Sequence, residues 1–143
     1  MTEQQRPVRY VVRREMMTDD ELREGGWDLD EARRDPHPNM WTVHAYAVAR
    51  SGQERPVAHF ELHSKGFEFG YGGSGPAELA RCLLIDWFGL HDAAARDPKH
   101  AGVPVDYEAF KRHFIAPVSQ DEREFSIDAT AIQAWVDEQP EGA

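Results

Sequence analysis

The chain of 143 residues contains one cysteine and no long apolar run. Because Cys82 is alone, it can form neither an internal disulfide nor a cysteine-rich zinc site. No stretch approaches the ~20 apolar residues of a membrane span, and Met1–Pro7 lacks the apolar segment of a secretory signal. These absences predict a soluble, cytoplasmic protein with no membrane association.

Positive charge is also scarce. The sequence has 26 acidic and 16 basic side chains, a formal charge of −10. Residues 119–143 carry seven acids against Arg123 alone, hence 1 − 7 = −6. Because nucleic-acid affinity comes largely from Lys and Arg, this balance makes a nucleic-acid partner improbable. It is compatible with a protein partner that has a basic surface, or with solubility alone.

The length fits a single domain over residues 1–143. Residues 8–13 alternate apolar and polar side chains and predict a strand. The run Thr18-Asp19-Asp20-Glu21 is a capping-box signature, and the rest of residues 1–39 reads as an irregular excursion. Residues 40–138 form the predicted core, and 139–143 a frayed tail.

Two alternating segments, 40–50 and 55–64, predict a hairpin closed by a two-residue type II′ turn at Gly52. In the register that this turn sets, opposed residue numbers sum to 105, so that Val43 faces Leu62. A further turn at Lys65-Gly66 adds a strand over 67–71. The sequence therefore predicts an antiparallel meander of three to four strands with one apolar face.

A core helix is predicted over 76–90, with Pro76 in its first turn and Gly89 at its end. Its apolar side chains cover about half of the circumference and would lie on the apolar face of the sheet. Two more helices are predicted near the C-terminus, one capped by Asp106 and the other by Asp128. The fold class is therefore α+β.

The junction between strand and core helix reads Gly70-Tyr71-Gly72-Gly73-Ser74-Gly75-Pro76, which contains G-x-G-x-x-G. A dinucleotide site is disfavoured because Pro76 follows the third glycine and the preceding strands form a meander, without parallel crossovers. A P-loop would need Gly-Lys-Ser/Thr, which the run lacks. Pro76 also occupies the position where a nucleophile elbow centred on Ser74 needs glycine.

Two interpretations of this junction remain. The backbone N–H groups of Gly72, Gly73, Ser74 and Gly75 could form an anion nest for phosphate or carboxylate, although Glu78 would oppose the anion. The favoured interpretation is structural: the glycines let the chain turn from sheet to helix at positive φ.

Polar side chains on the predicted hairpin include His44, His59, Glu61 and His63. His59 and His63 would lie about 13 Å apart along one strand and could not share a metal. A loose site that combines His44 with Glu61 and one of them is an alternative, but a solvated polar face is favoured, with no metal. Cys82 lacks a neighbouring base and is expected to be a packed side chain.

The run from Phe67 to Ala80, with its Gly-Tyr-Gly-Gly-Ser-Gly-Pro-Ala segment, a following Glu78 and a Leu-Ala helix, resembles a family of uncharacterised bacterial and phage proteins. The similarity extends over roughly residues 40–138. The resemblance implies an association with phages or mobile elements and no particular activity.

The leading hypothesis is a small non-enzymatic protein-binding or accessory module that needs no cofactor. The alternative is a small-ligand, phosphate-binding or catalytic domain that uses the Gly70–Pro76 loop with the polar hairpin face.

Overall fold

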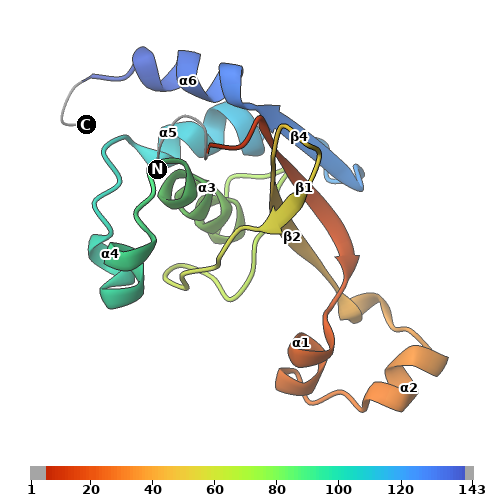
Figure 1. Ribbon diagram of the computed structural model, residues 1–143. Coiled ribbons are helices and arrows are strands. Elements are labelled where there is room, and N and C mark those ends of the chain that lie inside the picture. The colour runs from red at the N-terminus through yellow and green to blue at the C-terminus, as the bar shows by residue number, and fades with distance from the viewer. Residues whose placement is uncertain (1–5, 141–143) are drawn as a thin grey trace.

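A four-stranded antiparallel sheet carries helices on one face (Figure 1). The computed structural model describes residues 6–140. The strands are β1 (Arg9–Met16), β2 (Trp41–Val48), β3 (Glu54–Pro56) and β4 (Glu124–Asp128). The helices are α1 (Asp19–Glu24), α2 (Leu29–Arg34), α3 (Ser74–Trp87), α4 (His91–Arg96), α5 (Tyr107–Phe110) and α6 (Ala129–Asp137). Shorter turns are η1 (Pro38–Met40), η2 (Pro98–His100) and the π-helical η3 (Lys111–Ile115). The predicted α+β class is confirmed.

Strand β1 lies inside the sheet, in the order β3-β2-β1-β4. It pairs with β2 along its whole length and with β4 from Arg9 to Arg13. Tyr10 and Val12 are completely buried beneath the helices. The strand predicted over residues 8–13 is confirmed as β1, which extends to Met16 and is an interior strand of the sheet.

The predicted register of the β2–β3 hairpin is wrong by three residues. Ala47 pairs with Arg55, so that opposed numbers sum to 102 and not to 105. The Ala49 N–H donates to the Gln53 carbonyl across a longer loop, in which Gly52 has φ +92°. A three-residue loop with a glycine in the left-handed region replaces the expected two-residue turn.

The predicted third strand, 67–71, does not pair with residues 60–64. Phe67 instead forms an isolated bridge with Val43 of β2. Residues 57–66 form no strand, because the N–H groups of Leu62 and Ser64 donate to the Glu78 carboxylate of α3 and leave no ladder for a neighbouring strand.

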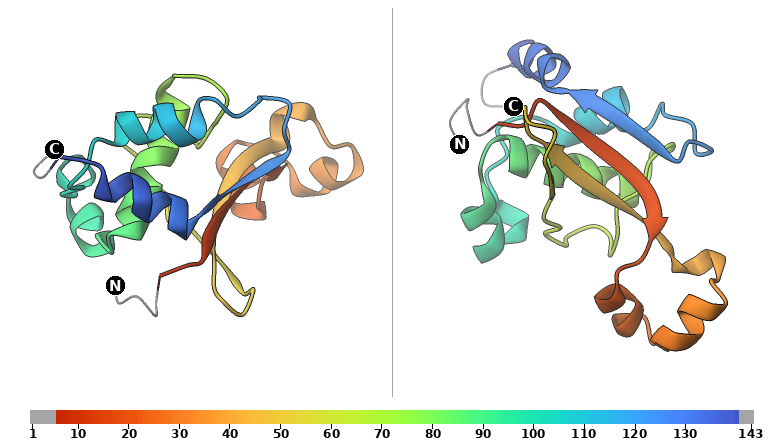
Figure 2. Two further views of the ribbon diagram at one scale, coloured as in Figure 1. Left: turned by 90° about the horizontal axis from the view of Figure 1, so that it is seen from above. Right: turned by 45° about the vertical axis from the view of Figure 1, so that its right-hand side comes forward.

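The core helix is confirmed as α3, which begins after Gly73 and ends before Gly89. Every residue from Gly75 to Trp87 is buried. Figure 2 shows α3 on one side of the sheet, with α4 and α5 near it. A helix buried on all sides must satisfy its polar side chains inside the protein, and this requirement produces the polar centres described below.

The segment between β1 and β2 projects from the end of these strands (Figure 1). The predicted capping box is present at Thr18 and Glu21 of α1. Leu22, Ala32 and Met40 are buried in a small core of this projection, separate from the main core. None of the helices within residues 6–140 is long and apolar enough to cross a membrane.

Both predicted C-terminal helices are present. Asp106 caps the first, in which α5 runs into η3, and Asp128 precedes α6 without a side-chain capping bond. Strand β4, which the sequence analysis does not predict, lies in the acidic stretch before α6. Of the predicted tail, residues 141–143 lie outside the described part of the chain.

Candidate functional site

The glycine-rich junction lies at the N-terminus of α3, with Gly73 as its N-cap residue. The Gly72 carbonyl accepts a hydrogen bond of 3.1 Å from Lys111 Nζ. Gly70 has φ +89°, and a Cβ placed on it would lie 2.8 Å from the Val118 carbonyl oxygen. The expectation that the glycines turn the chain at positive φ holds at Gly70, whereas Gly72, Gly73 and Gly75 do not adopt a positive φ.

The four predicted nest residues Gly72, Gly73, Ser74 and Gly75 do not line any of the four surface hollows found around Arg81, His44, Pro7 and Trp27. The anion nest therefore remains a prediction from the sequence without a neighbouring cavity among these four.

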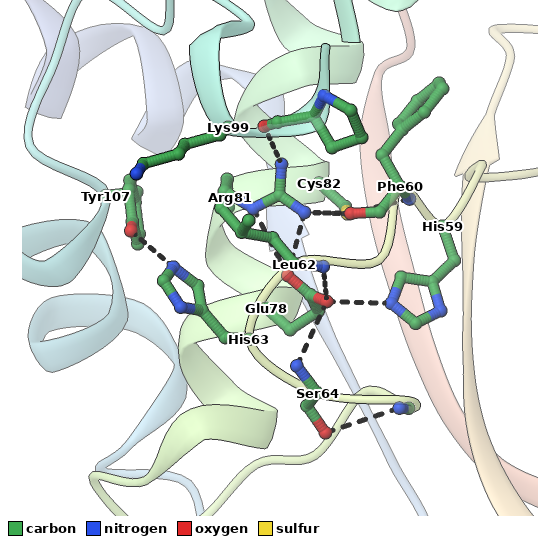
Figure 3. Close-up of polar contacts among 12 residues, drawn as sticks. His59, Phe60, Leu62, His63, Ser64, Glu78, Arg81, Cys82, Lys99 and Tyr107 are labelled. Carbon is green, nitrogen blue, oxygen red and sulfur yellow. Dashed lines mark hydrogen bonds and ion pairs between the residues drawn. The ribbon is translucent and has the colours of Figure 1, made fainter. Parts of the chain in front are cut away.

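A buried ion pair on α3 is the most connected polar feature beside the core (Figure 3). Glu78 is fully buried, and Arg81 is 3% exposed. Arg81 donates to Glu78 Oε1 from Nη2 at 2.8 Å and from Nε at 3.2 Å. The other carboxylate oxygen, Oε2, accepts from the Leu62 N–H at 2.8 Å, from His59 Nε2 at 3.0 Å and from the Ser64 N–H at 3.2 Å. We call these groups the Glu78–Arg81 centre.

The hydrogen bonds decide the ionisation of Glu78. Burial alone would raise its pKa, but donation from Leu62, Arg81 and His59 outweighs burial and lowers the pKa to about 2. The carboxylate is therefore a weak base that is anionic at neutral pH. It fastens residues 59–64 to α3.

The nearby thiol is also unreactive. Cys82 is buried, as expected, and burial raises its pKa to about 11. A thiol that holds its proton at neutral pH is a poor nucleophile. Neither Glu78 nor Cys82 offers acid–base or nucleophilic chemistry, so this centre is built for holding rather than for bond cleavage.

A second buried carboxylate, Asp86, lies two turns further along α3. Arg55 of β3 binds it in bidentate fashion at 2.7 and 3.0 Å, and the Tyr10 hydroxyl donates at 2.6 Å. His91 Nε2 lies 3.0 Å from Asp86 Oδ1. Burial alone would raise the pKa of Asp86, but Arg55 and Tyr10 lower it overall. This centre joins β1, β3 and α4 to α3.

The three histidines of the alternative metal site have separate partners. His44 contacts Glu15 and Glu21 at 2.8 and 2.7 Å, His59 binds Glu78, and His63 Nε2 lies 2.6 Å from the Tyr107 hydroxyl. His44 and His59 do line one small hollow of about 180 Å³, whereas Glu61 is exposed on the loop. Within residues 6–140, no group of three or more His, Cys, Asp or Glu residues could hold a metal ion.

Sequence analysis missed the roles of Arg81 and Asp86, and it treated Glu78 only as a charge opposing an anion. The spacing 78, 81, 86 places them along one side of a helix, a pattern usually typical of a solvated stripe. The Glu-x-x-Arg pair was the available signal, since opposite charges at i and i+3 are neighbours. Their burial depends on the loops that cover this side.

A larger hollow, of about 690 Å³, opens beside the Glu78–Arg81 centre. We call it the 98–107 hollow, because Arg81 and residues 98–103 and 105–107 line it. Figure 3 shows Lys99 reaching toward Tyr107 above Arg81.

Strand β4 is an edge strand in an acidic stretch of the sequence, and Arg13 of β1 lies 3.9 Å from Glu124. The Arg123 backbone carbonyl accepts from the Arg14 N–H, and the Ala129 N–H donates to the Val8 carbonyl. The odd-numbered residues of β4 therefore form its backbone hydrogen bonds with β1. Because bonding alternates along an antiparallel pair, Glu124 and Ser126 direct their N–H and C=O groups to the open edge. Residues 119–128 contain four acids and Arg123, hence 1 − 4 = −3.

Comparison with protein families finds one model, described as Family of unknown function (DUF6166), which matches residues 31–138. The match begins within α2 and ends just after α6, nine residues earlier at its start than the resemblance noted in the sequence. No curated protein and no solved structure matches the chain. Because the family model covers 108 of the 143 residues, the chain belongs to the Family of unknown function (DUF6166).

Proposed function

We propose that this protein is a non-enzymatic binding module that takes up an extended basic segment of a partner protein along the open edge of β4. The observation that carries the proposal is a strand edge that has no partner strand within residues 6–140 and lies in an acidic stretch of the chain. An added strand would gain main-chain hydrogen bonds from the edge and charge attraction from the acids around it.

The charges of β4 indicate which kind of segment binds its open edge. A second copy of β4 placed on the same edge would bring Glu124 and Asp128 close to their own copies, and like charges destabilise such pairing. Arg or Lys side chains would instead be attracted. The saturated carboxylates of Glu78 and Asp86 support a binding role over a catalytic one. No observation favours the alternative ligand site in the Gly70–Pro76 loop.

The experiment uses a soluble peptide of about eight residues in which Arg or Lys alternates with Val or Thr. We expect it to slow amide exchange at Glu124 and Ser126 more than at Phe125, which already bonds to β1. Raising the salt concentration from about 0.05 to 0.5 M should weaken binding, because exposed charges are screened. The same peptide with Glu in place of the basic residues should not bind.

Two variants test the edge itself. Ser126→Pro removes the outward N–H, and proline is tolerated on a strand edge, so the protein should fold but lose the peptide. Ser126→Ala keeps the N–H and should bind like the parent. Equal binding by Ser126→Pro and Ser126→Ala, or protection confined to Phe125, would refute the proposal.

A further inference from the structure

The 98–107 hollow has the size of a small-molecule site. Its volume of about 690 Å³ falls within the roughly 300–1,000 Å³ of ligand pockets. The 98–107 segment forms one side of it and the buried Arg81 side chain of α3 part of the other. It is separate from the β4 edge, none of whose residues line it.

Arg81 keeps one donor for a ligand. A guanidinium has five N–H groups. Four of them go to Glu78, which accepts twice, and to the carbonyls of Phe60 and Pro98. Among the described residues, the second N–H of Nη1 has no acceptor. Because Arg81 lines the hollow and its four other N–H groups hold it in place, this N–H is the donor that an anion bound there would meet.

A second cation stands at the hollow. Lys99 is an exposed lining residue, and the structure gives its ammonium group no hydrogen bond or ion pair within residues 6–140. Figure 3 shows the end of Lys99 beside Tyr107, whose hydroxyl points away from it toward His63 Nε2 at 2.6 Å. The Tyr107 hydroxyl is therefore already engaged, and Tyr107 offers the hollow its ring.

The acid at the rim is already engaged. Asp106 accepts from the N–H groups of Glu108 and Ala109 at 2.9 and 3.2 Å and thereby caps α5. Arg112 also lies 4.0 Å from its carboxylate. His100, the remaining ionisable lining residue, contacts Asp97 at 2.8 Å. The groups left to meet a ligand are therefore the Arg81 N–H and the Lys99 ammonium.

The rest of the wall is apolar. Ala101 and Val105 are buried, Val103 is half-buried, and the Tyr107 ring adds a flat surface. Apolar walls with a few fixed polar groups are typical of sites for small organic molecules. We propose that the 98–107 hollow binds a small organic anion, with an apolar body against Val103 and Val105 and a carboxylate or phosphate toward Arg81 and Lys99.

The probes are benzoate, phenyl phosphate, neutral benzamide and inorganic phosphate, each titrated into the full chain and followed by amide NMR shifts. We expect saturable shifts in residues 98–107 with benzoate or phenyl phosphate at a Kd below roughly 1 mM. Comparison of these two shows whether the anionic group is carboxylate or phosphate. Benzamide and inorganic phosphate should each bind at least about tenfold more weakly, because each lacks one half of the recognition.

The variant Lys99→Gln removes one exposed cation and should weaken binding about fivefold or more. Lys65→Gln makes the same charge change on the 57–66 loop, outside the hollow, and should leave affinity unchanged. Equal effects of the two lysine changes, equal binding of benzamide, or no saturable shift in residues 98–107 would each overturn the proposal.

Discussion

Glu78 and Asp86 show how a charged side chain becomes part of a core. A buried carboxylate is costly unless donors replace its lost hydration, and each of these two has at least four hydrogen-bonding contacts. Removing one partner of such a group leaves the other buried without compensation. These residues therefore tie segments distant in sequence to α3, and their ionisation is coupled to folding.

The pKa of Glu78 predicts acid sensitivity. It falls from an ordinary 4.5 to about 2 in the folded protein, so the native state favours the ionised form. The resulting stabilisation is complete above pH 4.5 and is lost as the pH falls from 4.5 through 2. It amounts to about 3 kcal/mol in the free energy of unfolding.

Urea unfolding between pH 2 and 7 measures this effect. At neutral pH, Glu78→Gln should be less stable than the parent by about 3–5 kcal/mol, because Arg81 loses its counter-charge. The difference should shrink as the pH falls. Glu61→Gln, on an exposed residue, is the control and should follow the parent. Parallel pH curves for Glu78→Gln and the parent would contradict the assignment.

Two glycines of the junction give a matched pair. Gly70→Ala would introduce a Cβ at φ +89° and 2.8 Å from the Val118 carbonyl, whereas a Cβ on Gly72 meets nothing within 4 Å. We expect Gly70→Ala to destabilise the protein by about 2 kcal/mol or more and Gly72→Ala to change stability by less than about 1 kcal/mol. Thermal unfolding compares them. A larger effect at Gly72 would speak against a structural role for Gly70.

At the level of elements, the helices were easier to predict than the sheet. Capping residues, Pro76 and Gly89 mark helix ends locally, so α3 and the C-terminal helices could be read from the sequence. Strand β4 was not predicted because it has only five residues. Its two apolar side chains, Phe125 and Ile127, alternate within an acidic stretch.

The predicted hairpin register was wrong because the actual register depends on a contact outside the hairpin. Alternation alone fits several registers, and Gly52 suits more than one turn. In the actual register Arg55 pairs with Ala47 and its side chain reaches the buried Asp86. A pattern of apolar and polar residues cannot predict that an arginine belongs on the core face. The Glu78–Arg81 centre was missed for the same reason, since its donors come from the loop 59–64.

For the whole molecule, β1 is part of the folded sheet but lies outside the residues that the family model matches. The matched residues 31–138 omit a strand that joins β2 to β4. We expect a variant lacking residues 1–30 to lose cooperative unfolding, because Tyr10 and Val12 leave the core and β4 loses its neighbour. Loss of NMR shift dispersion would report this outcome.

A second deletion serves as the control. The Met17 N–H donates to the Met40 carbonyl, so residues 18–39 can be replaced by an Asn-Gly turn, which is suited to closing such a hydrogen-bonded pair. This change removes 39 − 17 = 22 residues and adds two, yet spares every strand. The variant should keep a dispersed spectrum and unfold cooperatively. Folding of the 31–143 chain together with collapse of this variant would reverse our account.

The position of β1 also bears on how the protein is made. The last residue of β4 follows the last residue of β1 by 128 − 16 = 112 residues. At about 5–20 residues per second, a ribosome takes roughly 6–20 s to add them. Throughout that interval, the side of β1 that β4 will occupy stays unpaired on the nascent chain. The sheet therefore stays incomplete until β4 has been synthesised, and β1 is open to chaperones or to mispairing until then.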